Sequence, residues 1–161
     1  MIFSTVILNP KSFTGIRCDF MTEQERFVDN GDETVTDREM GLMWKKTDSM
    51  IDLKKWVNYQ EAVDYARELR ENKFAGYDDW RLPSKEEMLS LYDESFSQTD
   101  KFGKTIHISD KFASGCGFSM IAKQVDGRMR TWVLKLRDKE LEHPDGLWTL
   151  AEAARAVRVL K

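Results

Sequence analysis

The chain has 161 residues, of which 41% are hydrophobic and 33% are charged, and its formal net charge is −3. This size and composition indicate one globular domain that can bury a sizeable core. The small negative charge argues against bulk binding of nucleic acid, which needs a strongly basic face. No apolar run approaches the roughly 18 residues that a membrane-spanning helix requires.

Residues 1–25 predict an N-terminal strand and a polar connector, followed by a single domain over residues 26–161. The apolar start Met1–Leu8 lacks the basic residues and the cleavage pattern of a signal peptide. It therefore favours a strand, which could pair with a C-terminal strand, and a cytoplasmic location.

Residues 26–36 predict a β-hairpin, because Asn30–Gly31 suits a tight turn and the residues on both sides are β-branched or aromatic. A third strand is expected at Leu42–Trp44. The first clear helix begins after Asn58, since Glu61 stands three residues later and apolar residues then recur at helical spacing.

The segment from Gly76 to Glu87 is the most distinctive part of the chain. Ser84 and Glu87 have the spacing of a capping box, which predicts a second helix from about Lys85 to Asp93. The charged and aromatic residues before it are costly to bury singly but compatible as a satisfied cluster. The residues expected to form this structural signature are Asp79, Trp80, Arg81, Pro83, Ser84 and Glu87.

Residues 94–119 are rich in polar residues and glycine and predict a long loop with one or two short elements, which is often functional. Strands are expected again at Met129–Leu136, Leu147–Leu150 and Ala156–Leu160. Helices and strands that are segregated in this way indicate an α+β fold with an antiparallel sheet, two main helices and long loops.

The chain resembles the Lcl C-terminal domain family, which is found mainly in bacteria. The resemblance rests on Arg26–Asp37, on Gly41–Trp44, on the helix that contains Tyr65, on Gly76–Pro83 and on Val157–Arg158. It implies a C-type-lectin-like α+β domain from a family associated with surface proteins, adhesins and ligand binding. The run from Arg81 to Glu87 is also similar to a motif of formylglycine-generating enzymes.

Three carboxylates near the hairpin raise the question of a metal site. Asp29, Asp32 and Asp37 could supply oxygen ligands for calcium, but their spacing does not fit an EF-hand. The favoured interpretation is that they cap the hairpin and solvate a loop. We therefore expect no metal site and no cofactor.

Catalytic chemistry has little support. Cys18 and Cys116 lie in unrelated segments and either form one disulfide or remain reduced, and Cys116 has no basic neighbour to activate it. His107 and His143 belong to no nucleophile or zinc motif, and His143 is most simply a turn residue before Pro144. We expect no catalytic residue.

The C-terminal strands are the favoured ligand site. From residue 123 onward nine lysines and arginines stand against six carboxylates. Arginine guanidinium groups can form paired hydrogen bonds with sulfate or carboxylate groups, and a flat aromatic ring can pack against a sugar. The alternative is a solvent-exposed strand face with ordinary ion pairs. The predicted ligand-binding residues are Arg128, Arg130, Trp132, Lys135 and Trp148.

Together these observations predict a non-enzymatic binding module. Its expected ligand is a glycan, for which an anionic glycan is one candidate, or a partner protein. Binding is expected at the 94–120 loop and the C-terminal strands. The alternatives are an enzyme-derived domain related to formylglycine-generating enzymes, and a structural domain that forms homo-oligomers within a larger bacterial protein.

Overall fold

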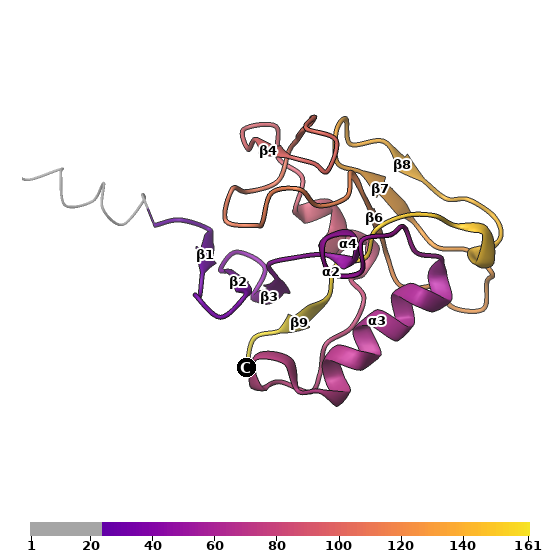
Figure 1. Ribbon diagram of the computed structural model, residues 1–161, viewed down its shortest axis with the longest axis horizontal. Helices are drawn as coiled ribbons and strands as arrows, with labels where there is room; N and C mark the ends of the chain where they lie inside the picture. The colour runs from indigo at the N-terminus through magenta and orange to yellow at the C-terminus, as the bar shows by residue number, and fades with distance from the viewer. Residues whose placement is uncertain (1–23) are drawn as a thin grey trace, which may run out of the picture.

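The computed structural model describes residues 24–161, so the N-terminal strand and Cys18 lie outside the described residues. The fold is α+β, as predicted, with antiparallel sheets and a few helices (Figure 1). In Figure 1 the sheet that contains β1 to β3 and the sheet formed by β6 to β8 lie on opposite sides of helices α2 and α4.

A four-stranded sheet has the order β1–β2–β3–β9, and every pair is antiparallel. Its strands are β1 (Phe27–Asp29), β2 (Thr34–Asp37), β3 (Leu42–Lys45) and β9 (Val157–Val159). The predicted hairpin is confirmed, and Gly31 in its turn has a φ of 81°, which favours glycine. The C-terminal strand β9 is also confirmed, and it pairs with β3.

Both predicted helices begin where their capping boxes indicated. Asn58 caps α3 (Tyr59–Glu71), and Ser84 caps α4 (Lys85–Ser90), each with the reciprocal glutamate bond. Helix α4 ends at Ser90, about one turn earlier than expected. The sequence did not predict the short helix α2 (Ser49–Leu53), although Asp48 accepts a hydrogen bond from the Ile51 amide as its N-cap.

The C-terminal third is less extended than predicted. The expected strand at Met129–Leu136 is reduced to β7 (Val133–Lys135), which lies between β6 (Ser119–Ile121) and β8 (Leu141–Glu142). The strand expected at Leu147–Leu150 was wrong, because a 3₁₀ turn, η2 (Leu147–Thr149), stands there. The Thr149 amide and hydroxyl both bond back to the Gly146 carbonyl, which holds the backbone in a turn.

The 94–120 segment contains β4 (Gln98–Thr99) and β5 (Thr105–Ile106), in agreement with the expected short elements. It is also part of the hydrophobic core, because Ile106, Ile108 and Phe112 are buried in the cluster that includes Trp44. The segment is therefore anchored at several points, and only part of it is free to form a surface.

The signature segment joins α4 to the four-stranded sheet. Arg81 exchanges both backbone hydrogen bonds with Val157 of β9, at 3.0 and 2.9 Å. Trp80 is fully buried and its indole donates to the carbonyl of Phe74, in the 3₁₀ turn η1 (Phe74–Gly76). These contacts make the segment a packing junction.

Two ion pairs satisfy the charges of this segment. Arg81 forms a bidentate pair with Glu87, at 2.8 and 2.9 Å, and Asp79 accepts from Arg158 Nε at 2.6 Å. Arg158 is buried and its guanidinium lies 3.7 Å from the centre of the Tyr77 ring. The charged residues of the signature segment therefore pair with Glu87 of α4 and Arg158 of β9, and Asp79 does not pair with the nearby Arg81.

Replacing Arg81 with alanine is expected to lower the free energy of unfolding by about 1 kcal/mol, because the pair with Glu87 is partly exposed. Urea denaturation measures this loss. Ligand binding should survive in the folded variant. Unchanged melting together with lost binding would show that Arg81 contacts the ligand.

Candidate functional site

Three of the predicted ligand-binding residues, Arg128, Arg130 and Trp132, lie near His143. Trp132 stacks on His143 with ring centres 4.0 Å apart and an angle of 10° between the rings. The Lys85 ammonium lies 4.2 Å from the centre of the Trp132 ring. Since His143 occupies one face, Lys85 must cover the other, and the indole is held between a cation and an imidazole.

Arg130 reaches the same stack from the preceding residues. It donates to the His143 carbonyl at 2.9 Å, and its Nε lies 2.8 Å from Asp145, although this N–H is not aligned for a hydrogen bond. Arg128 is exposed in the turn that contains Gly127. We call the group Lys85, Lys123, Arg128, Arg130, Trp132 and His143 the Trp132 surface.

A shallow groove of about 320 Å³ opens beside Trp132, between the start of α4 and residues 123–126. Lys85 and Lys123 line it together with Glu86 and Asp126, so cations from two segments meet there. Burial and the positive charges of Arg130 and Arg128 lower the pKa of His143. Burial is the larger cause, and the guanidinium charges add to it.

The other two predicted ligand-binding residues, Lys135 and Trp148, do not contact the Trp132–His143 stack in the described structure. Lys135 is in β7 and its ammonium pairs with Glu152 at 3.2 Å and with Glu142 at 3.7 Å. Trp148 is in η2 and 52% exposed. Arg128, Arg130 and Trp132 precede β7 and do not lie on one strand, and Lys85, Lys123 and His143 come near Trp132 only through the fold.

The 94–120 segment contributes a second surface. Phe102, which is 56% exposed, stacks on Trp56 with ring centres 6.5 Å apart, and Phe118 packs edge-on against Trp56 at 5.1 Å. The Lys101 ammonium lies 5.9 Å from the centre of Trp56 and 5.3 Å from that of Phe102. The Arg137 guanidinium covers Phe118 at 4.2 Å.

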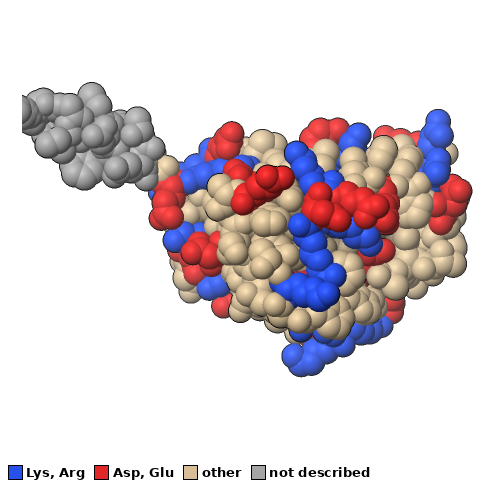
Figure 2. Space-filling view, turned by 90° about the horizontal axis from the view of Figure 1, so that it is seen from above, with Lys and Arg blue, Asp and Glu red and all other residues tan. Residues whose placement is uncertain are grey.

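Lys101 also borders an adjacent groove of about 340 Å³ between α2 and the 94–120 segment. The described residues that line it are Met50, Ile51, Lys54, Lys101, Ser114 and Gly115. We call this groove and the rings of Trp56, Phe102 and Phe118 the Lys101 surface. Figure 2 views the molecule from the top of Figure 1, the side where β4 lies, and shows basic side chains across the middle of that face with acidic ones beside them.

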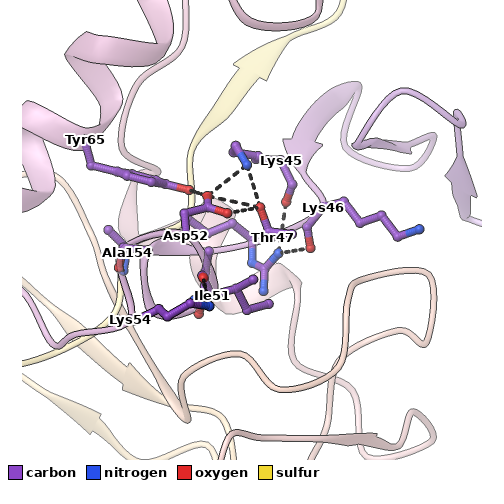
Figure 3. A network of polar contacts seen from close by, with 11 residues as sticks. Lys45, Lys46, Thr47, Ile51, Asp52, Lys54, Tyr65 and Ala154 are labelled. Atoms are coloured by element: carbon purple, nitrogen blue, oxygen red, sulfur yellow. Dashed lines mark hydrogen bonds and ion pairs between the residues drawn. The ribbon is translucent and has the colours of Figure 1, made fainter.

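A polar network joins β3, α2 and α3 (Figure 3). Asp52 accepts from the Tyr65 hydroxyl at 2.5 Å and from the Lys45 ammonium at 2.9 Å. Although burial opposes the shift, these hydrogen bonds lower the pKa of Asp52, while burial and the Asp52 charge raise that of Tyr65 well above its ordinary value. A phenol held protonated in this way cannot act as a base, so the network serves to join the three elements.

The hairpin carboxylates bind protein groups. Asp29 pairs with Lys46 at 2.7 Å, Asp32 accepts from the Thr34 hydroxyl, and the buried Asp37 pairs with Arg26. Within residues 24–161 there is no group of three or more histidine, cysteine or acidic side chains arranged to hold a metal ion. The three aspartates have roles in capping and ion pairing.

The sulfur and imidazole groups are also engaged. Cys116 is buried in the core, and burial raises the pKa of its thiol to about 11, so the reactive thiolate is scarce at neutral pH. His107 Nδ1 lies 2.9 Å from the Phe96 carbonyl. His143 is the aromatic partner of Trp132, a role beyond that of a turn residue.

The structure thus defines an α+β domain with two surfaces on which aromatic rings and cations alternate. No helix in the described part of the chain is long and apolar enough to cross a membrane. Residues 33–158 match the Lcl C-terminal domain, and the chain belongs to this family. No curated protein and no solved structure matches it, so the C-type-lectin-like form of the fold stays a prediction.

Proposed function

We propose that this domain is a binding module for an anionic glycan, which it holds at the Trp132 surface. The observation that carries the proposal is the aromatic stack of Trp132 and His143, which Lys85 and Arg130 contact, beside an open groove that Lys85 and Lys123 line. Lysine and arginine bind sulfate and carboxylate groups through charge-assisted hydrogen bonds. The indole supplies apolar area next to them once a ligand displaces Lys85, whose cation–π contact is worth only about 0.5–1 kcal/mol at an exposed site.

Titration of the whole chain with a sulfated polysaccharide such as heparin tests this function. Charge reversal of Arg128 or Lys123, both exposed, should weaken binding about tenfold at low salt, because each removes a charge-assisted contact. Reversal of the exposed Arg38, in the β2–β3 turn, is the matched control and should leave affinity unchanged. Absence of binding by the folded protein at low salt would contradict the glycan proposal.

The same site should show a pH dependence. The pKa of His143 is below its ordinary value of 6.5 in the free protein, and a bound anion would raise it, so binding takes up a proton. Affinity should therefore rise as the pH falls from about 7 to about 5. Histidine-to-glutamine replacement at position 143 should flatten this profile, and an unaltered slope would contradict the role of His143.

A further inference from the structure

We propose that the Lys101 surface is a second, separate binding site, which takes an acidic segment of a partner protein with aromatic side chains between its carboxylates. This inference does not depend on the glycan proposal, since the two surfaces share no residue. It follows from the charge of the groove, from the exposure of Phe102 and from the close packing of Trp56 beside it.

The charge of the groove favours carboxylates. None of the described residues that line it is acidic, and two of them are Lys54 and Lys101. Neither ammonium forms an ion pair within residues 24–161; Lys54 lies 3.4 Å from the Ile51 carbonyl, and Lys101 lies over aromatic rings. Two unpaired cations above an apolar floor of Met50 and Ile51 complement acidic side chains from a partner.

The adjacent rings favour an aromatic side chain in the same partner. Phe102 exposes 56% of its surface, and it stacks on Trp56. Trp56 is itself held closely, because a Cβ atom on Gly117 would lie 3.2 Å from its ring and 2.6 Å from Ala153. A ring that is already held, as Trp56 is, loses little entropy on binding, and aromatic residues dominate the energy of many protein interfaces.

A two-fold symmetric dimer formed through this surface is unfavourable. In a two-fold symmetric dimer the same patch faces itself, so the unpaired Lys54 and Lys101 side chains of both copies would meet. Like charges placed together across an interface are costly. The charge pattern therefore points to a partner of opposite charge.

Fluorescence anisotropy with a labelled copolymer of glutamate and tyrosine tests the proposal on the whole chain. The copolymer should bind at low salt and more tightly than polyglutamate of the same length. Lys101→Glu and Phe102→Ala should each weaken binding about tenfold. Both side chains are exposed, so these variants should fold.

Matched controls separate the two sites. Met40→Ala shortens another exposed apolar side chain and should not alter copolymer binding. Arg128→Glu reverses a charge of the Trp132 surface, which can also attract carboxylates, so it should weaken copolymer binding much less than Lys101→Glu does. Heparin binding should respond to Arg128→Glu and not to Phe102→Ala, so either proposal can fail alone. Failure of the copolymer to bind, equal binding of polyglutamate, or a dimer that Phe102→Ala dissociates would overturn the inference.

Discussion

Replacing Trp80 with alanine should lower the free energy of unfolding by about 3–5 kcal/mol. The side chain is fully buried in the cluster that includes Tyr65 and Val57, so truncation leaves a large cavity. The replacement also leaves the Phe74 carbonyl without the indole donor, which now lies 2.9 Å away. Urea denaturation with linear extrapolation measures the loss.

Trp148→Ala is the matched control, because it removes the same atoms from a side chain that is 52% exposed. We expect a loss within about 1 kcal/mol for this variant. Similar losses for the two variants would show that burial of Trp80 at the junction is not what stabilises the fold.

Replacing Arg158 with alanine should cost about 3 kcal/mol. The guanidinium is buried, bonds to Asp79 and lies over the Tyr77 ring, so the variant loses an ion pair and a cation–π contact at once. Lys161→Ala is the control, since its exposed ammonium contacts the same carboxylate at 3.1 Å. That variant should cost less than about 1 kcal/mol.

The difference in unfolding free energy between the wild type and the Arg158→Ala variant should also depend on pH. The hydrogen bond from Arg158 holds the pKa of Asp79 below its ordinary value of 3.8. The pair therefore stabilises the fold fully above that value, and its contribution is lost as the pH falls through the lower pKa of the folded state. Wild type and Arg158→Ala should lose part of their difference in acid, and a constant difference would contradict the ion pair.

Local signals in the sequence predicted a large part of the fold. Asn30–Gly31 identified the hairpin, and the paired residues Asn58–Glu61 and Ser84–Glu87 identified the helix starts, because each signal acts over at most a few residues. The C-terminal strand was predicted for a similar reason, since Val157 and Val159 suit an extended backbone.

The errors lie where neighbours distant in sequence or the backbone of a turn override those signals. Leu147–Leu150 has the composition of a strand, but Gly146, with a φ of 78°, leads into a 3₁₀ turn. In the 94–120 segment the short elements were predicted, but the burial of several apolar residues in the core was not. The composition of a segment averages over its exposed polar residues and its buried apolar residues, and it does not show which of them face the core.

Family membership, the α+β class and the helix starts follow from the amino-acid order, because motifs and capping residues act through neighbours in the chain. The pairing of Asp79 with Arg158, the stack of Trp132 on His143 and the contact between Trp56 and Phe102 required the folded chain. Each joins residues brought together by packing, and the energy of such a contact depends on distance, burial and orientation, none of which is encoded in local spacing. Both proposed binding surfaces depend on contacts of this second kind.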